Sequence, residues 1–197
     1  SVMDSFFLPL LCPRQITFLA KAEYFNGTTL VGRLQKWFFT SSGSRPVNRT
    51  SASAGQDAMN TAVEVLNDGD LFGIYPEGTR SPDGRLYKGK TGVARIALAS
   101  GAQVIPVAMI GTGDVNPIGT WFPRPGKVRV KVGDPIYPIE FVNNRGLERD
   151  SYEAIRALTD HIMHQLQQLS GQEYADVYAA EVKKALAEGG DSSPHNP

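Results

Sequence analysis

LFGIYPEGTRS, residues 71–81, places a polar turn directly after an apolar run. The first six residues predict a buried strand. The turn that follows carries one carboxylate, one guanidinium and two hydroxyl groups within residues 77–81. A glycine-containing turn at the end of a buried strand is a common way to hold side chains at the edge of a sheet. We therefore expect a binding or catalytic site at this turn.

Helices and strands alternate on both sides of this stretch. Apolar residues at helical spacing predict helices over 30–38, 56–66, 91–100, 150–169 and 173–187, and apolar runs predict strands over 16–21, 103–112 and 127–136. Gly101 is expected to end the third helix, and Pro82–Asp83–Gly84 to form a turn. This alternation favours an α/β fold with a largely parallel central sheet flanked by helices. We expect one domain over 1–188 and a disordered tail over 189–197.

Composition and charge limit the classes of function. The 197 residues are 41% hydrophobic, which suits one globular domain, and 20 basic side chains balance 20 acidic ones. No nucleic-acid partner is expected from a chain without net charge, so any anion site must be local. The single Cys12 excludes an intramolecular disulfide and fits a reducing compartment. No apolar stretch has the length of about 18 residues that a transmembrane helix needs.

Four short blocks carry a resemblance to a known family. YPEGTRS (75–81) resembles the F-P-E-G-T-R-S block of the 1-acyl-sn-glycerol-3-phosphate acyltransferases, which are glycerolipid acyltransferases. FLAKAEYF (18–25) is similar to the family's K-x-E-L-F stretch, VNR (47–49) to a block that ends in a phosphate-binding arginine, and VIPVAMIGT (104–112) to its V-x-P-V strand. Their common order makes the resemblance specific. It implies the α/β fold of the glycerol-3-phosphate acyltransferases.

The family's catalytic motif is His-x-x-x-x-Asp, and SVMD matches only its second part. Asp4 takes the place of the motif's aspartate, and the histidine would lie two residues before Ser1. The resemblance implies that this histidine removes the proton from a hydroxyl that attacks an acyl thioester, for which its pKa is suited. Asp4 would orient the imidazole and stabilise its charged form. The resemblance implies no metal and no cofactor, with acyl-CoA or acyl carrier protein as co-substrate.

The resemblance also implies which residues bind the phosphate of the acceptor, a group that prefers forked or compact positive donors. Glu77 is expected either to bind a glycerol hydroxyl or to hold Arg80 in place. Asn48 stands where many relatives carry an acid, which affects how Arg49 is oriented. The expected phosphate-binding residues are Lys21, Arg49, Gly78, Thr79, Arg80 and Lys88.

Structural roles are the alternatives for several of these side chains. Asp4 could cap a helix that begins at Ser5, and Glu77 with Arg80 could form only a surface ion pair. Lys21 and Arg49 could be solvated residues without a ligand.

Two other features suggest chemistry only weakly. His161 and His164 have the spacing of a metal-binding pair, but no carboxylate or cysteine constellation supports a metal site. A lone cysteine such as Cys12 is more often a small buried residue than a nucleophile.

The resemblance implies an acyltransferase that moves a fatty acyl group from acyl-CoA or acyl carrier protein to 1-acylglycerol 3-phosphate, giving phosphatidic acid in phospholipid biosynthesis. Acylation of another lysophospholipid and a catalytically inactive lipid-binding module are the alternatives. TLVGRLQKWFF (29–39) either packs in the core or forms a membrane-interface surface. We expect peripheral association with the cytoplasmic face of a membrane, or anchoring by a segment outside this chain.

Overall fold

The computed structural model describes residues 8, 11–21, 45–47, 54–115 and 124–189, with residues 20, 21, 45–47 and 114 described by their backbone alone. The chain divides into two compact units, one ending at Ile74 and one beginning at Tyr75. Within the described residues, no helix is both long and apolar enough to cross a membrane. The predicted helix over 30–38 lies outside the described residues, as does the predicted tail except for its first residue.

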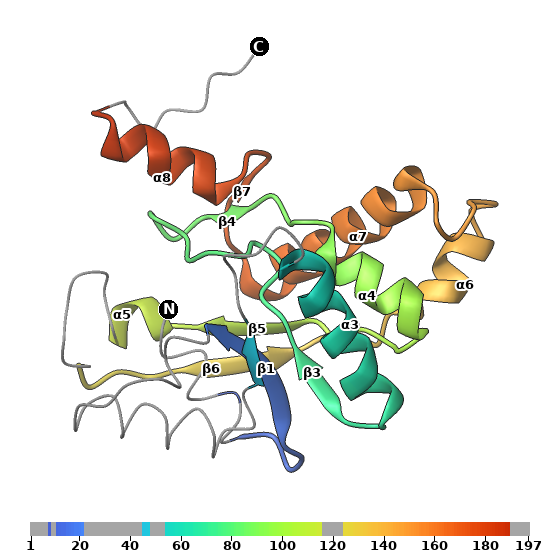
Figure 1. Cartoon of the computed structure of the whole chain (residues 1–197). Helices are drawn as coiled ribbons and strands as arrows, with labels where there is room; N and C mark the ends of the chain where they lie inside the picture. Colours follow the sequence, from blue (N-terminus) through green and yellow to red (C-terminus); the bar gives the residue numbers. More distant parts are fainter. Residues whose placement is uncertain (1–7, 9–10, 22–44, 48–53, 116–123, 190–197) are drawn as a thin grey trace. The chain divides into compact units, whose positions relative to one another are not determined.

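The unit that ends at Ile74 is built on a parallel sheet of three strands in the order β2–β1–β3 (Figure 1). Strand β1 (Ile16–Lys21) lies in the centre, between β2 (Arg45–Val47) and β3 (Leu71–Gly73). Helix α3 (Ala54–Asn67) connects β2 to β3, contacts both strands, and buries Ala62 and Val65. This βαβ arrangement confirms the strand predicted over 16–21 and the helix predicted over 56–66.

Strand β3 is shorter than the predicted strand over 71–76. The ring of Phe18 on β1 lies 2.3 Å from the place where a side chain on Gly73 would begin, so only glycine fits opposite this ring. The strand then ends, because the carbonyl of Tyr75 already accepts the amide of Gly78 in a turn. The polar turn is therefore separated from the strand by a single exposed residue, Ile74.

In the unit that begins at Tyr75, the core forms between three helices, α4 (Gly92–Ser100), α6 (Pro138–Asn143) and α7 (Tyr152–Ser170) (Figure 1). Leu158 on α7 and Val142 on α6 are fully buried there. Helix α4 ends at Gly101, which has a left-handed φ of 71° and donates its amide to Ala97. The predictions for α4 and α7 are confirmed, whereas α6 was not predicted from the sequence.

Strands β5 (Val107–Ile110) and β6 (Arg129–Val132) pair antiparallel, with Val107 opposite Val132. The predicted strand over 103–112 is real but shorter, although Val104 adds an isolated bridge to Ile136. The short helix α5 (Thr112–Val115) follows β5. All other strand pairs in the described residues are parallel, so the predicted α/β class with a largely parallel sheet is confirmed.

The prediction of one helix over 173–187 is wrong in its first half. Residues Tyr174–Ala175 form strand β7, which pairs parallel with β4 (Leu86–Tyr87), and only Ala179–Ala187 form helix α8. The carbonyls of Glu173, Ala175 and Val177 accept amides from Leu86 and Lys88, at 2.9 to 3.1 Å. Because these carbonyls bond to a distant strand, they are not available for a helical turn.

Candidate functional site

The turn at the centre of the candidate site has a regular geometry that follows from its sequence. The amide of Gly78 donates to the carbonyl of Tyr75 at 3.0 Å, with Pro76 at the second position and Gly78 at the fourth. Type I turns favour proline and glycine at these two positions. The carbonyl of Pro76 in turn accepts the amide of Lys90 at 2.8 Å, which joins the turn to the segment before α4.

Gly78 is required at its position for two reasons. Its φ is +70°, a backbone conformation that other residues rarely adopt. A side chain there would also begin 3.1 Å from the methylene groups of Lys90, which is closer than ordinary contact. The predicted role of Gly78, to let backbone and ligand approach each other, is compatible with this geometry.

Glu77 is held by a backbone amide rather than by Arg80. Its Oε2 atom accepts the amide of Tyr87 at 2.9 Å, and among the described residues no ion pair joins it to Arg80. Partial burial raises the pKa of Glu77, against the opposing effects of the Tyr87 amide and the nearby Lys183. The alternative of a Glu77–Arg80 surface ion pair is therefore wrong, and Glu77 ties the turn to strand β4.

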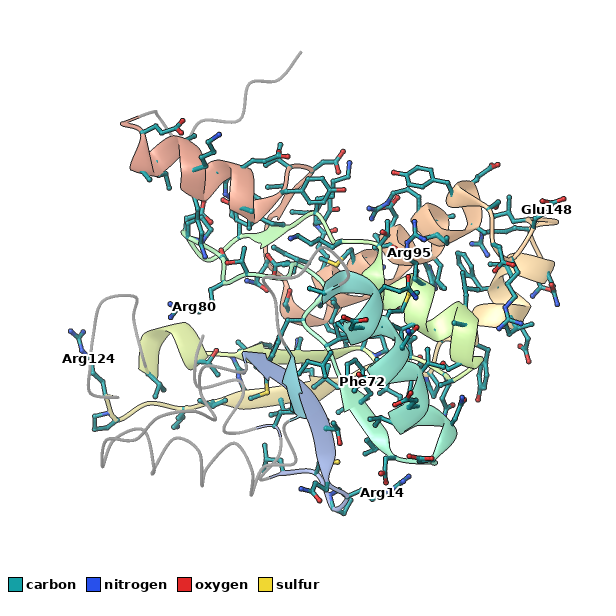
Figure 2. All side chains as sticks on the ribbon, viewed as in Figure 1. Arg14, Phe72, Arg80, Arg95, Arg124 and Glu148 are labelled. Atoms are coloured by element: carbon teal, nitrogen blue, oxygen red, sulfur yellow. The ribbon has the colours of Figure 1, made fainter. Side chains whose placement is uncertain are left out.

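Thr79 and Arg80 follow Glu77, and a lysine from α8 joins them. The ammonium of Lys183 donates to the Oγ1 atom of Thr79 at 2.8 Å. Arg80 is exposed, and Figure 2 shows its side chain extending outward from the turn. Burial and the nearby charge of Arg80 lower the pKa of Lys183, while Glu77 acts in the opposite direction. The ammonium of Lys90 also lies at the turn, 3.4 Å from the place where a side chain on Gly78 would begin. Three positive groups and one hydroxyl group thus gather at the turn, a combination suited to a phosphate.

The segment after the turn is stiffened by its own hydrogen bonds. The predicted turn at residues 82–84 is present: the amide of Gly84 donates to Ser81 Oγ at 2.9 Å, and that of Arg85 to Asp83 Oδ1 at 3.1 Å. Asp83 Oδ2 also accepts the hydroxyl of Tyr87 at 2.8 Å and the Nε atom of Arg85 at 2.7 Å. Burial raises the pKa of Asp83, but these hydrogen bonds outweigh it and lower the pKa overall. Tyr87 is fully buried, so the network fixes the strand to which Glu77 is bonded.

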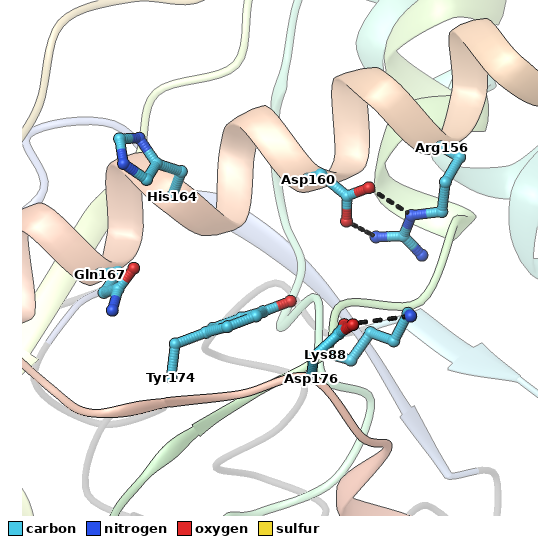
Figure 3. A pocket seen from close by; sticks show the side chains of 7 residues that line it. All are labelled: Lys88, Arg156, Asp160, His164, Gln167, Tyr174 and Asp176. Atoms are coloured by element: carbon cyan, nitrogen blue, oxygen red, sulfur yellow. Dashed lines mark hydrogen bonds and ion pairs between the residues drawn. The ribbon is translucent and has the colours of Figure 1, made fainter. Parts of the chain in front are cut away.

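The side chain of Lys88 lines a pocket together with residues of α7 and β7, and its predicted role in binding phosphate stays a prediction. Its ammonium pairs with Asp176 at 3.0 Å and lies 5.9 Å from the centre of the Tyr178 ring. Figure 3 shows it among side chains of α7 and β7, around a cavity of about 350 Å³. Because its charge is already paired, Lys88 contributes less free positive charge to the site than the sequence suggested. The cavity is lined by Lys88, Arg156, Asp160, His164, Gln167, Tyr174 and Asp176.

Three predicted residues cannot be placed with the turn. Asp4 and Arg49 lie outside the described residues, and of Lys21 only the backbone is described, at the end of β1 where it pairs with Val47. The roles predicted for these three side chains, and the alternatives of a helix cap or a solvated cation, therefore stay predictions.

The structure brings together Glu77, Gly78, Thr79 and Arg80 from the predicted set, and it adds Lys183, which sequence reasoning missed. Lys183 lies 104 residues beyond its hydrogen-bond partner Thr79. No local pattern marks it, since the adjacent Lys184 has the same chemistry and lies on the same helix.

The two histidines on α7 have different surroundings, since His161 packs on a ring and His164 lines the cavity described above. The ring of His161 stacks on Phe141 with 4.8 Å between the ring centres, and burial lowers its pKa, as do Arg145 and His164. Among the described residues, no group of His, Cys, Asp and Glu side chains could hold a metal ion. Cys12 is half-buried.

Known proteins resemble this chain over much of its length. A family model described as "Acyltransferase" matches residues 1–110. The 1-acyl-sn-glycerol-3-phosphate acyltransferase BAT2 of Brassica napus is 35% identical over 102 residues, covering 51% of this chain and 30% of the relative. The 1-acyl-sn-glycerol-3-phosphate acyltransferase of Bacillus subtilis is 27% identical over 159 residues, covering 81% of this chain and 71% of the relative.

The crystal structure of the 1-acyl-sn-glycerophosphate acyltransferase PlsC from Thermotoga maritima has the same fold, with a TM-score of 0.58 and 29% sequence identity. That comparison covers 79% of this chain and 57% of the Thermotoga chain. This chain thus spans about a third of the Brassica relative and somewhat over half of the Thermotoga protein. The family model covers more than half of the chain and includes the turn at residues 75–80. The chain belongs to the acyltransferase family.

Proposed function

We propose that this protein transfers a fatty acyl group from a thioester, either acyl-CoA or acyl carrier protein, to the free hydroxyl of 1-acylglycerol 3-phosphate. The product is phosphatidic acid, a precursor in phospholipid biosynthesis. The observation that carries the proposal is the group at the turn, where Arg80, Lys183 and the Thr79 hydroxyl lie beside Glu77. The named relatives, which are 1-acyl-sn-glycerol-3-phosphate acyltransferases, support this choice of substrate.

The chemistry requires a base, a place for the phosphate and a leaving thiol. The acceptor hydroxyl attacks the thioester carbonyl as a histidine takes its proton, and Asp4 stabilises the charged imidazole. The tetrahedral intermediate then collapses, the carbon–sulfur bond breaks, and the proton passes to the departing thiolate. In this proposal the histidine is the one that the family motif places five residues before Asp4.

The positive groups at the turn bind rather than react. Arg80 offers forked donors to two phosphate oxygens, and the exposed position of its side chain leaves it accessible to an acceptor. Arg49 and Lys21 are proposed as further phosphate-binding residues, because the blocks that contain them match those of the family. No cofactor is proposed besides the acyl donor itself. Because the acceptor and the product are lipids, we also propose that the protein works at the cytoplasmic face of a membrane.

Thiol release from palmitoyl-CoA in the presence of lysophosphatidic acid tests the proposal. The assay compares this chain with one extended upstream through the motif's histidine, and with the extended chain in which that histidine is alanine. Turnover by the extended chain alone supports the proposal. Turnover only with another lysophospholipid would change the acceptor, and no turnover with any acceptor would favour a lipid-binding module without catalysis.

A further inference from the structure

Positive side chains around the candidate site fall into two groups. Arg85 pairs with Asp83 at 2.7 Å, Lys88 with Asp176 at 3.0 Å, and Arg156 binds both carboxylate oxygens of Asp160. Arg80, Lys90 and Lys183 differ from these, because none of them forms an ion pair with a carboxylate in the described part of the chain. The Glu77 carboxylate attracts Lys183 but forms no ion pair with it, so positive groups outnumber negative ones at the turn. An anion bound beside these cations would reduce their mutual repulsion.

Lys183 is held in place more firmly than an ordinary surface lysine, by partial burial and by a hydrogen bond. Its side chain is half-buried, and it uses one of three ammonium donors to bond Thr79 Oγ1 at 2.8 Å. Because Thr79 accepts this bond, the hydrogen of its own hydroxyl is free to point elsewhere. Two ammonium hydrogens and one hydroxyl hydrogen are thus available to an acceptor beside Thr79, the residue that directly precedes Arg80.

Helix α8 brings Lys183 to the turn because its apolar side is anchored. Ala179 and Val182 pack against the buried ring of Tyr87, which belongs to the strand that bonds Glu77. The next residue, Lys184, is exposed and lies 3.9 Å from Glu188 on its own helix. Two adjacent lysines on one helix therefore differ in whether they reach the site.

We propose that Lys183 is a phosphate-binding residue of this site, and that its ammonium, the Thr79 hydroxyl and the Arg80 guanidinium together bind one phosphate monoester. This inference rests on the proposed function for the identity of the ligand. Lys183 lies outside the region of the chain that matches the family model, residues 1–110. The phosphate belongs either to the lysophospholipid acceptor or to the nucleotide part of the acyl donor.

Direct binding tests the site without any need for turnover. sn-Glycerol 3-phosphate is titrated into this chain by calorimetry at low salt, with glycerol as the control ligand that lacks phosphate. We compare wild type with Lys183→Met, Lys183→Arg and Lys184→Met; methionine keeps the length of the stem but removes the charge. The loss of one charged hydrogen bond is expected to weaken binding about tenfold or more in Lys183→Met. Lys183→Arg should retain most of the affinity, and Lys184→Met should bind as wild type does.

Kinetics of the extended chain then identify the source of the phosphate. If Lys183 binds the phosphate of the acceptor, Lys183→Met raises KM for lysophosphatidic acid and leaves KM for monoacylglycerol and for palmitoyl-CoA unchanged. If Lys183 binds the phosphate of the donor's nucleotide part, the variant raises KM for palmitoyl-CoA but not for the palmitoyl thioester of dephospho-CoA, which lacks this phosphate.

Each result decides between phosphate binding and a purely structural role. Unchanged glycerol 3-phosphate affinity in Lys183→Met, with or without a lower melting temperature, would overturn the proposal and leave Lys183 as a support for Thr79. Weaker binding in Lys183→Met, in a protein whose wild type does not acylate lysophosphatidic acid, would uphold the phosphate site and reject the proposed function instead.

Discussion

Glu77 shows, at the scale of single residues, how one side chain serves both structure and chemistry. One of its oxygens accepts the Tyr87 amide, so the turn and strand β4 are joined through a carboxylate. Its charged form is disfavoured by burial, which is the main reason that its pKa is raised from the ordinary value of 4.5. Besides this structural hydrogen bond, we propose that Glu77 orients a substrate hydroxyl.

The two functions of Glu77 can be separated by substitution. Glu77→Ala leaves the Tyr87 amide without its acceptor and should lower the free energy of unfolding by about 1–3 kcal/mol. Glu77→Gln keeps a carbonyl oxygen at the same place, so it should be at least as stable as wild type at pH 7. Urea denaturation measures both. If Glu77→Gln is as unstable as Glu77→Ala, the loss of the acceptor oxygen for the Tyr87 amide is not the cause of the destabilisation, and the prediction is wrong.

The raised pKa of Glu77 also has a consequence for pH. The folded protein holds this proton more tightly than the unfolded chain, so stability decreases as pH rises from 4.5 through the higher pKa of the folded state. Relative to wild type, Glu77→Gln should therefore gain stability over this interval and keep the gain above it. Urea denaturation of both proteins between pH 4 and pH 7 measures the difference, and a difference that is constant with pH would contradict the raised pKa.

At the scale of elements, the site depends on helix α8, which is far from the turn in the sequence. The helix is held by a small apolar cluster in which Val177 and Val182 pack against Tyr87, Ala175 and Ala179. Because strand β7 also pairs with β4, the whole segment from 173 to 187 is fixed to the strand that anchors Glu77.

Val182→Asp should loosen α8 without unfolding the rest of the protein. A carboxylate in this cluster loses hydration without gaining a partner, at a cost of about 1–3 kcal/mol. Hydrogen exchange should become faster in residues 179–187 while α4 and α7 stay protected. Leu186→Asp is the matched control, because Leu186 lies on the same helix but is 44% exposed. Equal exchange in both variants would show that the Tyr87 cluster does not anchor α8.

At the scale of the whole molecule, most of the buried apolar residues that the structure describes belong to the unit that begins at Tyr75. Its main core joins α4, α6 and α7, and the segment 86–91 leads from the site directly into α4. The guanidinium of Arg156 on α7 donates to the carbonyl of Gly89 at 2.9 Å, which ties that segment to the core. The stability of this core therefore determines how firmly the site is held.

Leu158→Ala should destabilise this unit strongly. Leu158 is fully buried, and truncation of a buried leucine typically costs about 2–5 kcal/mol through lost burial and the cavity that remains. Thermal denaturation should show a lower melting temperature, with a far smaller change for Tyr152→Ala on the same helix, where the side chain is 67% exposed. Similar losses in both variants would mean that Leu158 does not lie in a packed core.

Local features of the fold could be predicted from the sequence alone. Strand β1, helices α3, α4 and α7, and the turn at residues 82–84 follow from apolar periodicity, glycine and short-range hydrogen bonding. The polar turn at 75–80 follows in the same way from Pro76 and Gly78. Each of these depends on residues only a few positions apart, so the pattern and its physical cause lie in one short stretch.

Contacts between distant segments were decided only by the tertiary structure. The sequence favours helix over 173–187, but pairing with β4 makes residues 174–175 a strand because their carbonyls find partners there. The sequence did not indicate that Glu77 accepts the Tyr87 amide, and its predicted contact with a glycerol hydroxyl stays a prediction. Lys88 is paired with Asp176, and Lys183 takes a place at the turn. These partners are chosen by packing across many intervening residues, where local periodicity carries no information.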